Sequence, residues 1–143
     1  NLEGMLNPMA LALAAGGGVV ARGFSGQQKQ LLQLYKAGIE HKGFSLIDVF
    51  SPCVTFNKIQ TYPWFRERVY KLEDESHDPT DLRAANERAL EWGSRIPIGL
   101  FYRNPDPRRP IDELDKSLES GALVHQSTEV SPEQRAKAIA EFM

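Results

Sequence analysis

A single cysteine, Cys53, is the residue of this sequence best suited to chemistry. It comes three positions after residues 44–50, a run rich in β-branched and aromatic residues that predicts a strand. In open α/β sheets, ligands bind beyond the carboxyl ends of the strands, so a thiol at this point can ligate a metal or attack a substrate. One cysteine is too few for a zinc site or an iron–sulfur cluster, which need about four ligands. The alternative is an inert buried thiol, because free cysteine is among the most buried residue types.

A Cys–His nucleophile pair would need one of the three histidines as its base. His41 comes at the end of a predicted helix, where the helix dipole explains a basic residue. His77 precedes a helix cap, and His125 lies in a polar tail. No feature of the sequence directs any of them toward Cys53, so we do not expect this pair to form.

Three other patterns admit a functional interpretation but have a simpler structural one. Backbone amides at Ser25 and Gly26 could bind a phosphate, yet the spacing is not that of a dinucleotide or P-loop fingerprint. Segment 77–81 has the composition of a metal-ligand run, but helix capping explains its two acids. Aromatic and basic residues over 62–71 could stack nucleic-acid bases. We expect ordinary packing there, because a formal net charge of −2 argues against nucleic acid as the main partner.

Composition indicates one ordinary globular domain in 143 residues, with 41% hydrophobic and 25% charged residues. No run approaches the roughly 18 apolar residues of a membrane span, so we expect no membrane partner. A lone cysteine has no internal disulfide partner, which favours a cytoplasmic location. The chain opens on Asn1 without an initiator methionine, and such a start is typical of a cut through a longer protein or of N-terminal processing.

The elements expected before Cys53 form a strand–helix–strand unit. They are, in order, a helix capped by Asn7 with Pro8 in its first turn, a strand over 19–22, a helix opened by a capping box of Ser25 and Gln28, and the strand over 44–50. Such a crossover is nearly always right-handed and joins parallel strands. The predicted class is therefore α/β, with a parallel sheet and flanking helices.

The second half of the chain is less regular. Its expected elements are a helix over 62–71, a helix capped by Asp78 with Pro79 in its first position, a strand over 96–102, and a last helix capped at Ser131. Pro97 cannot donate to a central ladder, so it favours an edge strand or the first residue of a strand.

Several motifs follow one another in an order that is more specific than any of them alone. They are Asn7-Pro8 with 10–14, then 20–26, 41–44, 47–49, Ser51-Pro52-Cys53-Val54-Thr55-Phe56-Asn57, Thr61-Tyr62 with Trp64, 77–81 and 96–102. This series resembles the β subunits of 2-oxoacid:ferredoxin oxidoreductases. The likeness covers roughly residues 5–102 and fades beyond Arg103.

The resemblance implies a fold and an activity. Residues 1–103 would be the C-terminal half of a thiamine-diphosphate-binding domain, and 104–143 a variable tail with a terminal helix. Members of this family convert a 2-oxoacid and coenzyme A to an acyl-CoA and carbon dioxide, with electrons passing to ferredoxin. The full-length subunit uses thiamine diphosphate, magnesium and a 4Fe–4S cluster, and it works with an α subunit. The resemblance leaves pyruvate, 2-oxoglutarate and a broad range of 2-oxoacids open as substrates, with 2-oxoglutarate slightly preferred.

The resemblance also gives Cys53 a role, since the cysteine of the Pro-Cys-x-Thr motif is the fourth ligand of that cluster in the family. Thr55 and Asn57 match the same motif. The other three cluster cysteines and the Gly-Asp-Gly motif that holds magnesium and the diphosphate are absent from this sequence. We therefore expect a fragment that binds no cofactor and is inactive alone. The alternative is a stand-alone, non-catalytic α/β binding or assembly module.

Overall fold

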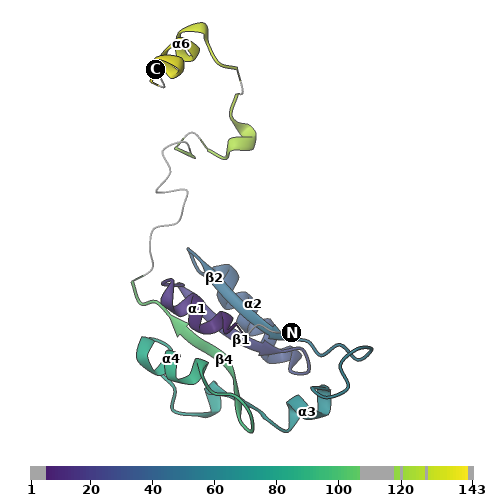
Figure 1. Ribbon diagram of the computed structural model, residues 1–143. Helices are drawn as coiled ribbons and strands as arrows, with labels where there is room; N and C mark the ends of the chain where they lie inside the picture. The colour runs from purple at the N-terminus through teal and green to yellow at the C-terminus, as the bar shows by residue number, and fades with distance from the viewer. Residues whose placement is uncertain (1–5, 107–117, 120, 128, 142–143) are drawn as a thin grey trace. The chain divides into compact units, whose positions relative to one another are not determined.

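The computed structural model describes residues 6–106, 118–119, 121–127 and 129–141. The chain divides into two compact units, Asn1–Arg109 and Pro110–Met143. The elements of the first unit are α1 (Pro8–Ala14), β1 (Val19–Phe24), α2 (Gln28–Glu40), β2 (Ser45–Phe50), α3 (Tyr62–Arg66), β3 (Val69–Lys71), the 3₁₀ turn η1 (Leu72–Asp74), α4 (Leu82–Ala89) and β4 (Ile96–Arg103) (Figure 1).

The four strands form one sheet in the order β2-β1-β4-β3. The predicted β1–α2–β2 crossover is present, and its two strands pair in parallel from Val19 opposite Ser45 to Phe24 opposite Phe50. Strands β3 and β4 are also parallel, whereas β1 and β4 are antiparallel. The predicted α/β class is confirmed. The sheet is mixed rather than fully parallel, because the two central strands, β1 and β4, are antiparallel.

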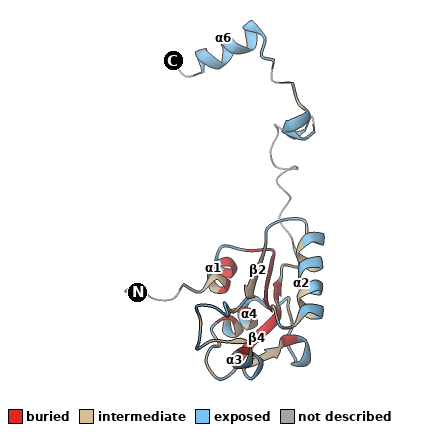
Figure 2. Cartoon of the chain, turned by 90° about the vertical axis from the view of Figure 1, so that its right-hand side faces the viewer, coloured by how far each residue is buried: buried red, intermediate tan, exposed pale blue. Residues whose placement is uncertain are grey.

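Helices cover both faces of the sheet. Helix α2 packs on one face, and α1 and α4 lie together on the other, as Figure 2 shows with the buried strands between them. The close approach of α2 depends on Gly23 of β1, because a Cβ there would lie 2.6 Å from Cδ1 of Leu31. The opposite face holds a core in which Met9, Val20 and Phe101 are fully buried.

The cap of α1 is as the sequence predicts. The Asn7 side chain accepts hydrogen bonds from the backbone N–H groups of Met9 and Ala10, at 3.1 and 3.2 Å. Its amide nitrogen also donates to the carbonyl oxygen of Ala89 at 2.8 Å. One side chain therefore begins α1 and joins it to the end of α4.

Two predicted caps are wrong. Gln27, not Ser25, is the cap residue of α2, and it makes no side-chain capping bond. Ser25 stays attached to the neighbouring strand, because its N–H donates to the carbonyl oxygen of Phe50 at 2.9 Å. Helix α4 is capped by Asp81 rather than by Asp78, and the Asp81 carboxylate accepts from the backbone N–H groups of Arg83 and Ala84.

Two other predictions in the second half also need correction. The expected helix over 62–71 stops at Arg66, and Val69–Lys71 becomes a strand because it pairs with β4. Pro97 does not lie in an edge strand, since β4 has a neighbour on each side. It lies near the start of β4, opposite Tyr70 of β3, and the pairing with β1 begins only at Gly99. The missing N–H of proline thus costs little there.

The described part of the second unit contains the 3₁₀ turn η3 (Leu123–His125) and helix α6 (Pro132–Ala140). The predicted capping box of α6 is confirmed, with Ser131 and Gln134 each bonded to the other's backbone N–H. Among the described residues, no helix has the length and apolar character that crossing a bilayer requires.

Candidate functional site

Cys53 lies in a loop just beyond the carboxyl end of β2, as the sequence predicts. A turn holds this loop in shape, because the N–H of Asn57 donates to the carbonyl oxygen of Cys53 at 3.0 Å. The Asn57 side chain in turn accepts from the N–H groups of Ile59 and Gln60, at 3.0 and 2.9 Å. Asn57 therefore organises the loop around the cysteine.

The Cys53 thiol is exposed to solvent, so the interpretation as an inert buried cysteine is wrong. Backbone N–H groups of Phe56 and Thr55 hydrogen-bond to the sulfur and lower the pKa of the thiol; Asn57 adds a smaller effect in the same direction. Partial desolvation opposes them but does not cancel them. A ring of N–H donors stabilises a thiolate, which is the form that binds metals and attacks electrophiles.

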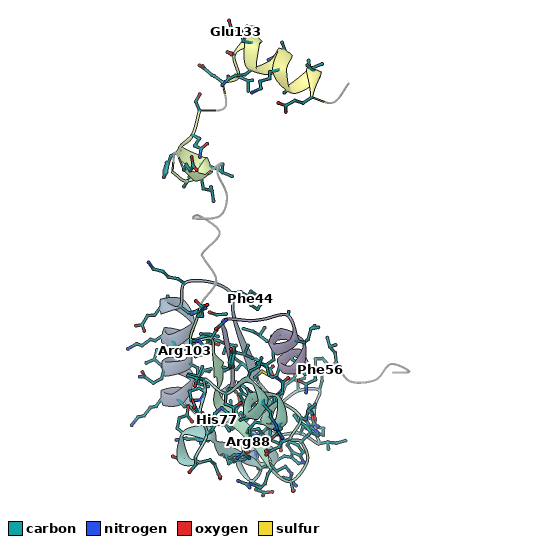
Figure 3. The ribbon with its side chains drawn as sticks, turned by 90° about the vertical axis from the view of Figure 1, so that its left-hand side faces the viewer. Phe44, Phe56, His77, Arg88, Arg103 and Glu133 are labelled. Atoms are coloured by element: carbon teal, nitrogen blue, oxygen red, sulfur yellow. The ribbon has the colours of Figure 1, made fainter. Side chains whose placement is uncertain are left out.

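Three apolar side chains of the same loop are also exposed to solvent. Val54, Phe56 and Ile59 are 69%, 87% and 80% exposed, and Figure 3 shows Phe56 at the rim of the unit. Large apolar groups gathered on one exposed loop are typical of a surface that binds another molecule or polypeptide. The loop thus combines a thiolate-stabilising turn with an apolar rim.

The two histidines of the first unit are placed away from this thiol or used elsewhere. His41 follows α2 and precedes β2, whereas Cys53 follows β2, so the six residues of that strand, at about 3.3 Å each, separate them. His77 is bonded through Nε2 to the carbonyl oxygen of Phe101 at 2.8 Å, which attaches its loop to β4. Neither forms a nucleophile pair with Cys53.

The other patterns have structural explanations in the fold. In segment 77–81, the Asp78 carboxylate accepts from the N–H and hydroxyl of Thr80, both at 2.8 Å, and Asp81 caps α4. Within the part of the chain that the structure describes, no three His, Cys, Asp or Glu residues form a group able to hold a metal ion.

The Ser25 pattern and the aromatic pattern also have structural roles in the fold. The Ser25 hydroxyl is hydrogen-bonded to the Tyr62 hydroxyl at 3.0 Å, and α2 begins only at Gln28. Phe65 of the aromatic segment is buried and stacks on Phe24 and Phe50, with ring centroids 5.5 and 4.9 Å apart. The packing interpretation of the aromatic segment is confirmed.

One charged pair was missed by sequence reasoning. Arg22 is only 4% exposed, and its Nε donates to Oδ2 of Asp48 at 2.9 Å. The guanidinium lies between the rings of Phe50 and Phe101, at 5.1 and 5.5 Å from their centroids. The sequence signal for this pair was an arginine and an aspartate that are each the fourth residue of a strand. The parallel register of β1 and β2 sets these two residues opposite each other.

One known family and several curated sequences resemble this chain. A family described as the C-terminal part of the pyruvate ferredoxin oxidoreductase beta subunit matches residues 53–119. The β subunit of 2-oxoacid:ferredoxin oxidoreductase 1 from Aeropyrum pernix is 45% identical over 115 residues, which is 73% of this chain and 36% of that protein. A 2-oxoglutarate synthase subunit from Methanocaldococcus jannaschii is 38% identical over 122 residues, 83% of this chain and 43% of the relative.

A solved structure extends the likeness to the fold. The 2-oxoglutarate:ferredoxin oxidoreductase from Magnetococcus marinus, with 2-oxoglutarate, coenzyme A and succinyl-CoA bound, superposes with a TM-score of 0.74 at 34% identity. The match covers 98% of this chain and 46% of that chain. The fold and sequence thus define a β-subunit portion of a ferredoxin-linked oxidoreductase. The chain belongs to the 2-oxoacid:ferredoxin oxidoreductase β-subunit family and spans less than half the length of these relatives.

Proposed function

We propose that this chain contributes to the oxidative decarboxylation of a 2-oxoacid to an acyl-CoA, with electrons passing to ferredoxin, as part of a β subunit. Its partners in this proposal are the remainder of the β subunit, an α subunit and ferredoxin. Similarity at 45% identity to a 2-oxoacid:ferredoxin oxidoreductase β subunit supports the assignment. The ligands of the Magnetococcus marinus enzyme favour 2-oxoglutarate as the first substrate to test. Thiamine diphosphate and magnesium would be held by residues outside this chain.

Cys53 carries the most specific part of the proposal, in which its thiolate is one ligand of a 4Fe–4S cluster. The supporting observation is an exposed thiol whose pKa is lowered by the backbone N–H groups of Phe56 and Thr55. Because this is the chain's one cysteine, the other three thiolates would come from elsewhere in the protein. When bound, such a cluster would relay electrons one at a time.

The residues around the thiol have defined tasks in this assignment. The N–H donors of the turn would offset negative charge on the ligating sulfur, which raises the reduction potential of an iron–sulfur centre. The apolar side chains of Val54, Phe56 and Ile59 would exclude water from the centre once another part of the protein covers them. Asn57 would keep the loop in the shape that aims the N–H groups at the sulfur.

Iron content of the assembled enzyme tests this assignment independently of activity. We expect Cys53→Ala in the complete subunit to reduce bound iron and to abolish the paramagnetic signal of the reduced 4Fe–4S centre. Ser51→Ala, two residues away on the same exposed loop, is the matched control and should retain both. A Cys53→Ala enzyme with unchanged iron content and an unchanged signal would exclude Cys53 as a ligand.

The isolated chain tests the second part of the proposal, that this portion has no activity alone. We expect no coenzyme-A-dependent reduction of an electron-accepting dye when the chain is supplied with 2-oxoglutarate, thiamine diphosphate and magnesium. Turnover under these conditions would refute the assignment of the chain as a dependent part. Stoichiometric binding of thiamine diphosphate by the chain would refute the placement of that site outside it.

A further inference from the structure

A cavity of about 390 Å³, whose lining does not include Cys53, lies between the start of α1, the end of α4 and strands β1 and β2. Its volume falls within the range of small-molecule sites. Its apolar walls are formed by Leu6, Pro8, Phe50, Leu90 and Trp92. The charged pair Arg22 and Asp48 also lines it.

The charged pair has unused hydrogen-bonding capacity. Arg22 is only 4% exposed, and its guanidinium has five N–H donors. Only Nε has a partner, Oδ2 of Asp48, and the buried Nη1 has none among the residues that the structure describes. On the Asp48 carboxylate, Oδ1 makes no hydrogen bond within the same part of the chain. A spare donor and a spare acceptor therefore belong to adjacent groups.

The other polar groups at the cavity are already used. The Asn7 side chain accepts from the first turn of α1 and donates to the carbonyl oxygen of Ala89. Glu91 accepts from the Tyr70 hydroxyl at 2.6 Å and from Arg88 at 2.7 Å. Recognition of a ligand would thus depend on Arg22 and Asp48.

Charge balance decides what kind of ligand these two groups accept. Arg22 already has Asp48 as its counter-ion, and the carboxylate of Glu91 has Arg88. An entering anion or cation would be buried without a compensating charge, which is costly. A neutral group avoids that cost, provided that it accepts from the guanidinium and donates to the carboxylate.

We propose that this cavity binds an uncharged planar molecule through a carboxamide edge. The amide carbonyl oxygen would accept from Arg22, and the amide N–H would donate to Asp48. The rings of Phe50 and Trp92 would contact the planar body of the ligand, since both line the cavity. The proposal is independent of the role assigned to Cys53.

Three probes of similar shape separate the contributions of the amide, the charge and the ring. Benzamide carries the donor and the acceptor, benzoate replaces the amide by a charge, and toluene has neither. Titration of the 143-residue chain is followed by nuclear magnetic resonance at the Trp92 indole N–H and the backbone N–H groups of Asp48 and Phe50. We expect saturable shifts with benzamide and a Kd of about 1 mM, typical of a ligand of this size. Benzoate and toluene should each bind at least about tenfold more weakly.

A variant reverses the charge argument. Asp48→Asn keeps the side-chain volume but leaves the Arg22 charge without a counter-ion, so benzoate should then bind more tightly than benzamide. Arg83→Gln, on the exposed face of α4, is the control and should leave all three affinities unchanged. Two results with the unaltered chain would each overturn the proposal: no saturable shifts with benzamide, or benzoate binding as tightly as benzamide.

Discussion

Replacing Asp48 by alanine removes the one hydrogen-bond partner that the described residues give to the buried guanidinium of Arg22. Arg22 is 4% exposed and its guanidinium lies over the Phe50 and Phe101 rings, so its charge is largely shielded from solvent in the intact chain. Removing one partner of a buried ion pair costs roughly 3–5 kcal/mol of unfolding free energy. Because the Asp48 side chain is itself 22% exposed, we expect the low end, about 3 kcal/mol.

That loss is large enough to measure directly. For a unit of this size, about 3 kcal/mol corresponds to a Tm lower by roughly 12–24 °C. Urea unfolding of the chain, followed by the fluorescence of Trp64 and Trp92, gives the free energy, and circular dichroism gives the Tm. Asp48→Asn retains an oxygen acceptor and should cost less than Asp48→Ala.

A double variant separates the charge from the packing. Arg22→Met with Asp48→Leu replaces the pair by apolar groups of similar volume and should be far less destabilising than Asp48→Ala alone. A loss below about 1 kcal/mol for Asp48→Ala would refute the reasoning, because that value is typical of a hydrated surface pair. It would mean that the guanidinium finds another partner or reaches water.

The remaining predictions concern three other sites. Burial, and after it the Glu91 carboxylate, raises the pKa of Tyr70 from 10.0 to about 12. The stability that the neutral phenol contributes should therefore be lost as the pH rises from about 10 to about 12. Glu91→Ala should lower the pKa of Tyr70, which an absorbance titration measures. Asp81→Ala should cost about 1 kcal/mol in urea unfolding as the loss of a helix cap. Asp78→Ala should cost less, and the reverse order would restore Asp78 as the cap. Because backbone N–H groups lower the pKa of the Cys53 thiol, iodoacetamide should alkylate the folded chain faster at neutral pH than the urea-unfolded chain; equal rates would contradict the thiolate-stabilising turn.

The sequence alone determined the parts of this protein that depend on local signals. Asn7 and Pro8 begin α1 as predicted, and Ser131 with Gln134 begins α6, because a cap is formed by residues within a few positions of each other. The parallel crossover β1–α2–β2 followed from periodicity and handedness, and it placed Cys53 beyond the carboxyl end of β2. The ordered motifs were sufficient to indicate the family.

Tertiary structure decided whatever depends on residues far apart in the chain. Val69–Lys71 pairs with β4, 27 residues later in the chain, and this long-range ladder makes it a strand, whereas the sequence interpretation had continued the helix from Tyr62 through these residues. Ser25 lost its expected cap role to a hydrogen bond with Phe50. The environment of Arg22 was also invisible in the sequence, since its burial and its pairing with Asp48 arise only when two strands are set in register beneath α1 and α4.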